Sequence, residues 1–253
     1  MDMEINLTGK IVLVTGATGQ LGRVMAYTLA SCGADVAIHY LKNRAMADEL
    51  SRTIAALGRR ALAVQADITD GASVTGMRDA IQQELGVPDI VVNNAVSHYT
   101  WKSILEQNID DFQDQFESVV KQNVLSAKAF IPGMIEKKAG RFIGINTECS
   151  YLCNANSGAY ASAKRGLDGL YRVLAKEVGA QGVTVNQVAP GWTISEKDRT
   201  EHTEDAPEYS KNVPLRRRGT DQEIANAVAF LASDLASFIT GVCIPVSGGT
   251  VMV

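Results

Sequence analysis

Sequence features that would indicate a metal centre, a membrane or secretion are scarce in this chain. Its 253 residues include only four cysteines and three histidines. Only Cys149 and Cys153 are close to each other, so no zinc-type cluster is evident and we expect no metal. Apolar runs stay short of the ~18 residues that a membrane-spanning helix needs. We therefore expect reduced thiols, no membrane partner and a cytoplasmic protein.

An excess of one charge sign is also missing. The chain has 24 lysines and arginines against 28 aspartates and glutamates, a formal net charge of −4. This balance argues against nucleic acid or an anionic membrane as the main partner. The first six residues contain two acids and no apolar core, so we expect no secretory signal. A hydrophobic fraction of 46% allows a sizeable core and argues against disorder.

Short apolar runs alternate with amphipathic stretches along the chain. The predicted strands are Ile11–Thr15, Asp35–Tyr40, Arg60–Gln65, Ile90–Asn93, Phe142–Asn146, Val183–Val188 and Val242–Val246. The predicted helices are Gln20–Ser31, Arg44–Leu57, Ala72–Leu85, Ile109–Lys137, Ser157–Val178 and Asp221–Ala232. Strands that are mostly apolar throughout suit a parallel sheet with both faces covered. The strict alternation predicts a single doubly wound α/β domain over residues 1–253.

One segment departs from this alternation. Residues 196–212 are dense in charge, contain Pro207 and show no apolar period. Because the segment lies between a predicted strand and a predicted helix, we expect either a solvated loop or a mobile lid. Residues 192–213 are therefore predicted to form a loop that covers the substrate.

A glycine-rich turn follows the first predicted strand directly. Gly16, Gly19 and Gly22 allow a tight turn and let backbone N–H groups approach a pyrophosphate at the start of a helix. A plain strand-to-helix turn is the alternative, since a glycine triplet alone is weak evidence. The dinucleotide interpretation gains from Asp67 after the third predicted strand and from residues 93–95 after the fourth, because both would line one crevice.

Tyr160 and Lys164 lie four residues apart near the start of a long predicted helix. That spacing puts both side chains on one face. An ammonium group close to a phenol favours the phenolate and lowers the pKa of the phenol towards neutrality. The pair is therefore a candidate acid–base unit, and an exposed tyrosine–lysine contact on a surface helix is the alternative.

Taken in order, these motifs resemble the short-chain dehydrogenase/reductase family over essentially the full chain. The pattern continues with an asparagine in the long crossover helix, a hydroxyl residue thirteen before Tyr160, residues 190–191 after the sixth strand and a C-terminal pattern at 232–241. The resemblance implies a Rossmann-type sheet of about seven strands. It also implies the catalytic residues Asn123, Thr147, Tyr160 and Lys164.

In this family the tyrosine donates or accepts the proton and the lysine lowers its pKa and holds the nicotinamide ribose. The threonine would orient the reacting oxygen, and Asn123 would position a relay water. The implied dinucleotide contacts are Gly16, Thr18, Gly19, Gln20, Leu21, Gly22, Tyr40, Lys42, Asn43, Asp67, Ile68, Asn93, Ala95, Tyr160, Lys164, Pro190, Gly191, Thr193 and Ser195.

Several departures from the family pattern bear on these roles. Gln20 and Val96 each stand where glycine is usual, and Thr147 stands where serine is usual. Asn123 lies about one helical turn closer to Thr147 than the family pattern implies. We expect the variant glycine-rich turn to bind a dinucleotide.

The end of the second predicted strand indicates which dinucleotide is preferred. NAD-selective members carry an acid there, whereas this chain has Tyr40, Lys42, Asn43 and Arg44. Lys42 or Arg44 could meet a 2′-phosphate, so we favour NADP(H), with NAD(H) as the alternative. Both cations could equally be solvated residues that open the next helix.

Aromatic and polar residues follow the predicted strand ends and could shape a substrate pocket. Tyr99 and Trp101 would contribute aromatic walls. The predicted substrate contacts are His98, Glu148, Tyr151 and Trp192. Ordinary loop packing or a subunit contact is the alternative.

These expectations combine into one predicted function. The chain is expected to be an NADP(H)-linked oxidoreductase that interconverts a small-molecule ketone or aldehyde and an alcohol by hydride transfer, with Tyr160 as general acid or base. The alternative is a non-catalytic nucleotide-binding sensor or scaffold. A homotetramer is expected, partly from the resemblance and partly because the apolar segments 242–246 and 251–253 need covering.

Overall fold

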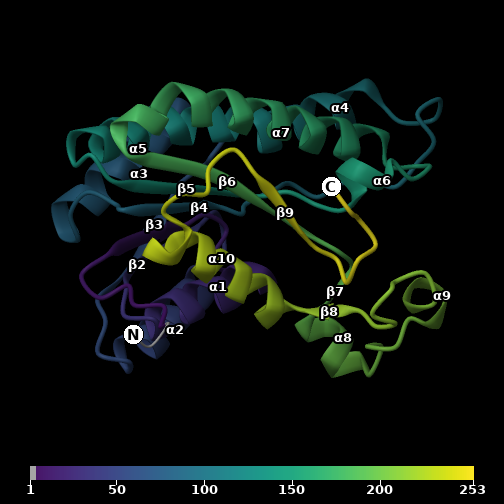
Figure 1. Ribbon diagram of the computed structural model, residues 1–253, viewed down its shortest axis with the longest axis horizontal. Coiled ribbons are helices and arrows are strands. Elements are labelled where there is room, and N and C mark those ends of the chain that lie inside the picture. Colours follow the sequence, from purple (N-terminus) through teal and green to yellow (C-terminus); the bar gives the residue numbers. More distant parts are fainter. Residues whose placement is uncertain (1–3) are drawn as a thin grey trace.

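A parallel seven-stranded sheet forms the centre of the computed structural model, which describes residues 4–253 (Figure 1). Residues 1–3 lie outside this range. They belong to the first six residues, which we expected not to form a secretory signal. The order of the strands in space is β3 (Ala61–Gln65), β2 (Asp35–Tyr40), β1 (Ile11–Val14), β4 (Ile90–Asn93), β5 (Gly140–Ile145), β6 (Val183–Pro190) and β9 (Cys243–Val246). Because the strand order reverses between β1 and β4, their carboxyl ends border the crevice in which such sheets bind ligands.

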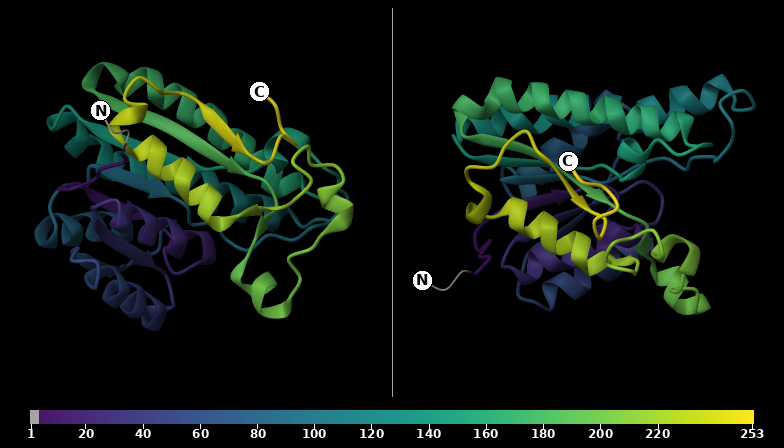
Figure 2. Two further views of the ribbon diagram at one scale, coloured as in Figure 1. Left: turned by 60° about the horizontal axis from the view of Figure 1, so that its bottom comes forward. Right: turned by 45° about the vertical axis from the view of Figure 1, so that its right-hand side comes forward.

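Helices cover both faces of the sheet (Figures 1 and 2). One face carries α1 (Gln20–Ser31), α2 (Arg44–Ala55) and α10 (Asp221–Ala232). The other carries α3 (Gly71–Glu84), α4 (Ile109–Phe116), α5 (Gln122–Glu136) and α7 (Gly158–Val178). Two short helices, α8 (Glu196–Glu201) and α9 (Pro207–Ser210), stand beyond the carboxyl ends of the strands, as Figure 2 shows in light green.

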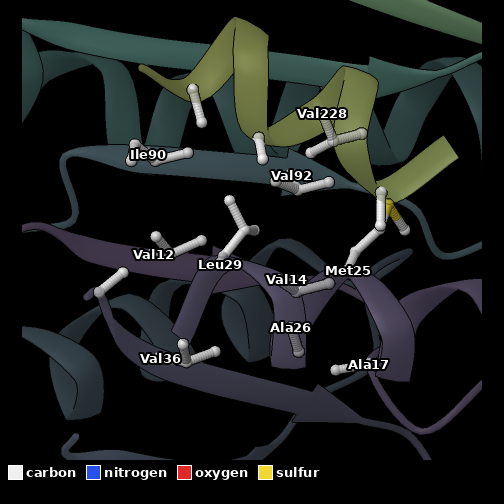
Figure 3. Packing of buried hydrophobic residues seen from close by; sticks show 14 of the residues in the cluster. Val12, Val14, Ala17, Met25, Ala26, Leu29, Val36, Ile90, Val92 and Val228 are labelled. Carbon is white, nitrogen blue, oxygen red and sulfur yellow. The ribbon is translucent and has the colours of Figure 1, made fainter. Parts of the chain in front are cut away.

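Apolar side chains between the sheet and its helices hold this framework together. Val12 on β1 pairs in register with Val36 on β2 and with Ile90 on β4. Figure 3 shows Leu29 of α1 and Val228 of α10 pointing into the same cluster, and these side chains are fully buried. Each fully buried aliphatic side chain contributes roughly 1.5–3 kcal/mol relative to an exposed one. The packing therefore fixes the strand ends and the residues that follow them.

The seven predicted strands are all present, with shifts of a few residues at their ends. The predicted helix over Ile109–Lys137 is present from Ile109 to Glu136, but it is not α-helical throughout. It consists of α4, a π-helical turn over Glu117–Lys121 and α5, which follow one another without a break. A π turn adds a residue to one helical turn, so the side chains after it point in a different direction from those of a continuous α-helix.

Residues 196–212, predicted to form either a solvated loop or a mobile lid, are mostly exposed but contain regular structure. The segment contains α8 and α9, and it follows the short strand Thr193–Ile194 (β7), which pairs in parallel with Gly219–Thr220 (β8). Asp198 completes a capping box at the start of α8 and pairs with the buried Arg218 at 2.9 Å. The charges that suggested solvent exposure are therefore partly used in internal ion pairs.

All four cysteines, which were expected to be reduced, are free thiols. Within residues 4–253, no helix combines the length and the apolar character needed to cross a bilayer. The same residues contain no group of three side chains that could hold a metal ion.

Candidate active site

A cavity of about 700 Å³ opens at the carboxyl ends of β4, β5 and β6. It is lined by parts of the glycine-rich turn, the loop after β4, the turn after β5, the start of α7 and the segment after β6. The sequence-predicted residues in this lining are Gln20, Leu21, Thr147, Glu148, Tyr160, Lys164, Pro190, Gly191, Trp192, Thr193 and Ser195. The fold thus brings the predicted catalytic tyrosine, lysine and threonine to one space.

Two of the predicted substrate contacts do not belong to this lining. His98 is exposed and stacks on Tyr99 with ring centroids 6.3 Å apart. The Arg165 guanidinium lies over the Tyr151 ring at 4.8 Å. The geometry therefore does not bring His98 or Tyr151 into the candidate substrate space.

Two close backbone approaches shape the glycine-rich turn. Gly16 has φ +62°, in the left-handed region that favours glycine, and a Cβ there would lie 3.0 Å from Ala95 Cα. A Cβ on Gly22 would collide with the Gly16 carbonyl oxygen. Within residues 4–253, no side chain caps the first turn of α1 after Gly19. The N–H groups at this helix start are therefore available to a phosphate group, so the turn fits a dinucleotide.

His39 on β2 holds this turn in place, a role that the sequence analysis missed. The Gly16 N–H donates to His39 Nδ1 at 2.9 Å, and His39 Nε2 lies 3.0 Å from the Ala66 carbonyl oxygen. One ring nitrogen accepts and the other donates, which is the pattern of a neutral imidazole. Burial lowers the pKa of His39 and favours the same form. The only signal in the sequence was a polar residue inside an apolar strand.

The residues predicted to select the dinucleotide lie at the end of β2. Asn43 Oδ1 accepts from the Met46 N–H at 3.1 Å and so caps α2. Arg44 pairs with Asp48 at 3.3 Å, but both side chains are exposed, and such pairs contribute little stability. Lys42 is also exposed. Both cations therefore remain accessible to an anionic group at this edge of the sheet.

Asp67, predicted to contact the adenine, follows β3 at the same edge. Its Oδ1 accepts from the Thr69 hydroxyl at 2.7 Å and from the Thr69 N–H at 2.9 Å. These hydrogen bonds lower the pKa of Asp67 and keep it a carboxylate. Asp67 can thus accept hydrogen bonds but has no proton to donate.

Tyr160 and Lys164 line the cavity from the first turns of α7. Lys164 is buried, and its Nζ donates to the Ile145 carbonyl oxygen at 2.6 Å and lies 5.7 Å from the Tyr160 ring centroid. Burial lowers the pKa of Lys164 to about 8. Burial also raises the pKa of Tyr160, with a smaller opposing effect from the Thr147 hydroxyl. The expected lowering of the tyrosine pKa is therefore not seen, because burial outweighs the effects that favour the phenolate.

Thr147 reaches the same cavity from the turn after β5. Its N–H donates to Asn146 Oδ1 at 2.8 Å, and its Oγ1 accepts from the Cys149 N–H at 3.2 Å. Asn146 Nδ2 donates in turn to Gln187 Oε1 at 2.7 Å and to the Lys164 carbonyl oxygen at 3.2 Å. This buried network, which the sequence analysis missed, fixes Thr147 relative to the helix that carries Lys164.

Asn123, predicted to hold a relay water, lies in a different buried network. Its Nδ2 donates to the Val119 carbonyl oxygen at 2.7 Å, and its Oδ1 accepts from the Tyr171 hydroxyl at 2.6 Å. Asn93, predicted to lie near the ribose, donates to the same Tyr171 hydroxyl at 3.1 Å. Neither asparagine lines the cavity. The π turn just before Asn123 changes the helical register, which explains why sequence position misplaced this side chain.

Aromatic side chains border the cavity in two pairs. Tyr99 and Trp101, from the loop after β4, meet edge to face at 5.3 Å. Trp192, after β6, meets Tyr209 of α9 edge to face at 5.4 Å. The Tyr209 hydroxyl donates to Glu148 Oε1 at 3.0 Å. Tyr209 was missed because it lies in the segment expected to lack regular structure.

Comparison with known proteins agrees with this geometry. The profile of a family described as Enoyl-(Acyl carrier protein) reductase matches residues 16–251. The chain is 38% identical over 257 residues to the 3-oxoacyl-[acyl-carrier-protein] reductase FabG of Pseudomonas aeruginosa, covering 98% of this chain and all of the relative. It is also 38% identical over 253 residues to FabG of Escherichia coli strain K12, with the same coverage.

Two solved structures share the fold over nearly their whole length. One is a 7α-hydroxysteroid dehydrogenase complexed with NADH and 7-oxo glycochenodeoxycholic acid, at a TM-score of 0.89 and 31% identity, covering 97% of this chain and 96% of that one. The other is a blue fluorescent protein from a metagenomic library in complex with NADPH, also at 0.89 and 31%, covering 98% and 100%.

The family profile spans most of the chain, and the relatives match it from end to end. The predicted Rossmann-type parallel sheet is confirmed, and the reading as a non-catalytic sensor or scaffold is not favoured. The chain is an NAD(P)-dependent oxidoreductase and belongs to the short-chain dehydrogenase/reductase family.

Proposed function

We propose that this oxidoreductase interconverts a ketone or an aldehyde and an alcohol, with Tyr160 as the group that exchanges the proton on oxygen. The observation that carries this proposal is the meeting of Tyr160, Thr147 and Lys164 on one cavity at the carboxyl ends of the strands. The 3-oxoacyl group in the name of the FabG relatives and the 7-oxo compound bound to the hydroxysteroid dehydrogenase are both ketones. They support carbonyl chemistry without fixing the substrate.

Each residue has a distinct part in the proposed reaction. A bound nicotinamide supplies or accepts the hydride at its C4 position. Thr147 donates a hydrogen bond to the carbonyl oxygen and so orients it, while Tyr160 protonates that oxygen as hydride arrives at carbon. Lys164, next to Tyr160 and held by the Ile145 carbonyl oxygen, stabilises negative charge on the phenol oxygen. Alcohol oxidation reverses these proton movements.

NADP(H) is the proposed preferred dinucleotide. Lys42 is exposed at the end of β2, and Arg44 is engaged only by an exposed pair with Asp48. Either cation can meet a 2′-phosphate without breaking a buried contact. The predicted contacts from Gly16 to Gly22 and at Asp67 and Ile68 belong to the same proposal, because they follow β1 and β3 at this edge.

Residues 192–213 are proposed to cover the substrate. Trp192 and Tyr209, near the two ends of this segment, both line the cavity. Ion pairs of Arg199 with Asp221 at 2.7 Å and of Arg218 with Asp198 at 2.9 Å anchor α8 to the rest of the domain. The segment thus contributes a wall to the pocket from outside the sheet.

A homotetramer in the cytoplasm is the proposed state of the protein. Phe238, Met252 and Val253 are exposed near the C-terminal end, and Leu105 and Ile109 are exposed near α4. Two separate apolar surfaces suit an assembly with two kinds of interface. The proposed location rests on the four free thiols, which are typical of a reducing compartment.

The test of this proposal is an assay with NADPH and a panel of ketones and aldehydes, in which the fall in NADPH absorbance measures its oxidation. Oxidation above background that disappears in Tyr160→Phe would support it. A panel that leaves NADPH untouched while the dinucleotide binds tightly would contradict carbonyl reduction.

A further inference from the structure

The candidate substrate space contains a buried carboxylate beside the proposed reacting group. Glu148 directly follows Thr147, is 5% exposed and lines the cavity. Its Oε1 accepts from the Tyr209 hydroxyl at 3.0 Å and from the Trp192 N–H at 3.2 Å, and its Oε2 lies 3.2 Å from the same hydroxyl. Within the described part of the chain, no ion pair includes Glu148. Burial raises the pKa of Glu148, and the hydrogen bonds from the Tyr209 hydroxyl and the Trp192 N–H oppose that rise. A cation beside the carboxylate would favour its charged form further.

The two other charged residues of the lining are each satisfied elsewhere. Lys164 donates to the Ile145 carbonyl oxygen at 2.6 Å. Asp221 is bound by both terminal nitrogens of Arg199, at 2.7 and 2.8 Å. Glu148 is thus the charge in the lining that is left to meet a ligand. A buried carboxylate without a cationic partner is costly, so a cation placed nearby would be favoured strongly.

Aromatic rings surround the same space. Tyr99 and Trp101 border it on the β4 side, and Trp192 and Tyr209 border it on the side of α9. The face of an aromatic ring attracts an ammonium group within about 6 Å, and aromatic cages are a recurrent way to bind quaternary ammonium groups. The Trp192 ring already carries the Arg218 guanidinium at 4.3 Å from its centroid, and Tyr99 stacks on Tyr160. Trp101 and Tyr209 remain as further rings near the carboxylate, a lining that suits an organic cation.

We propose that the substrate is an amino ketone, or the corresponding amino alcohol, whose ammonium group lies against Glu148 and these aromatic rings while its oxygen meets Thr147 and Tyr160. This inference rests on the carbonyl chemistry proposed above and adds the class of substrate. An anionic substrate would instead bring like charge to a desolvated carboxylate, which costs affinity. Glu148 is therefore a specificity-determining residue, whereas the proton transfer belongs to Tyr160.

Two ketones that differ only in one atom can test this proposal. Both are six-membered ring ketones with two methyl groups on the ring atom opposite the carbonyl. In the first compound that atom is a positively charged nitrogen (an oxopiperidinium ion), and in the second it is a carbon (a cyclohexanone). The two have the same shape, but only the first is charged. Binding of each to the NADP-loaded protein is measured by calorimetry. The cation should bind at least about tenfold more tightly, since carboxylate and aromatic contacts both favour it. Turnover of both compounds with NADPH is measured separately.

Glu148→Gln removes the charge but keeps an oxygen that can accept from Tyr209 and Trp192. This variant should bring the two affinities within about threefold of each other, because only the charge is lost. Glu208→Gln is the matched control, since Glu208 is exposed on α9 and pairs with Lys211 outside the cavity. It should keep the preference of the parent.

Equal affinities in the parent, tighter binding of the neutral ketone, or an unchanged preference in Glu148→Gln would each overturn the proposal. Reduction of the neutral ketone without any preference for the cation would leave the carbonyl activity standing and reject only the cationic substrate. Cation binding that depends on Glu148, with neither compound reduced, would uphold the cation site and contradict the proposed reaction.

Discussion

The ring of Tyr99 lies flat against the ring of Tyr160, with centroids 4.0 Å apart and planes 13° from parallel. The stack joins the loop after β4 to the helix that carries Lys164. Burial is the main cause of the raised pKa of Tyr160, and the Tyr99 hydroxyl raises it further. Tyr99 therefore influences both the position and the acidity of the proposed proton donor.

Tyr99→Phe should move the pH profile of alcohol oxidation to lower pH. The variant keeps the stacked ring but removes the hydroxyl that raises the Tyr160 pKa. Alcohol oxidation needs the phenolate, so a lower pKa makes the active form available at lower pH. Initial rates across a pH series would check this. Tyr209→Phe, which loses a hydroxyl bound to Glu148 in the same cavity, should leave the profile in place. A shift to higher pH in Tyr99→Phe would contradict the prediction.

Tyr160→Phe should bind the dinucleotide normally and lose turnover. The substitution removes only the hydroxyl, and general acid–base catalysis typically contributes 10²–10⁴-fold. Lys164→Ala should lower both turnover and dinucleotide affinity, because the lysine is proposed to act on both. Steady-state rates and calorimetric binding separate the two effects. A fully active Tyr160→Phe on a verified substrate would refute the assignment.

Thr147→Val should lose most of the turnover while keeping dinucleotide affinity. Valine preserves the branched shape of threonine but cannot donate a hydrogen bond to the reacting oxygen. Thr147→Ser keeps the donor and should stay within about tenfold of the parent, roughly 1.4 kcal/mol. The comparison of kcat/KM for both variants on one ketone decides the matter. Equal activity of the parent and Thr147→Val would show that the Thr147 hydroxyl has no part in the reaction.

Much of this architecture could be predicted because its signals are local. The period of apolar residues located the seven strands, and a spacing of four put Tyr160 and Lys164 on one face. Asn123 shows where such reasoning stops, because the π turn at Glu117–Lys121 changes the register without an obvious sequence signal. The ion pair of Asp198 with Arg218 shows the same limit, since charges 20 residues apart look solvated until the fold joins them.

Lys42→Asp should weaken NADPH binding by about tenfold or more and affect NADH much less. The substitution replaces a cation near the proposed 2′-phosphate by a carboxylate. The carboxylate repels the 2′-phosphate of NADPH, which NADH lacks. Fluorescence titration with both dinucleotides measures the change in preference. Lys128→Asp makes the same charge change at an exposed position of α5 and should leave the preference as it is. Tighter binding of NADH than of NADPH by the parent would show that these cations do not select the dinucleotide.

His39 should make the stability of the protein fall at mildly acidic pH. Burial lowers its pKa in the folded protein below the ~6.5 of an unfolded chain. The unfolded state therefore binds a proton first as the pH falls. The stability that neutral His39 contributes is fully present above the unfolded pKa, and it is lost as the pH falls below that value towards the folded pKa.

His39→Asn tests this relationship because its amide oxygen can still accept from the Gly16 N–H but cannot titrate. Between about pH 7 and pH 5, the parent should lose about 1 kcal/mol more unfolding free energy than the variant, within the limit of ~1.36 kcal/mol per pH unit for one proton. Urea unfolding at the two pH values measures this difference. His202→Asn, at an exposed histidine after α8, should behave as the parent. If parent and His39→Asn lose the same stability, protonation of His39 does not compete with the Gly16 hydrogen bond, and the ring acts only as packing.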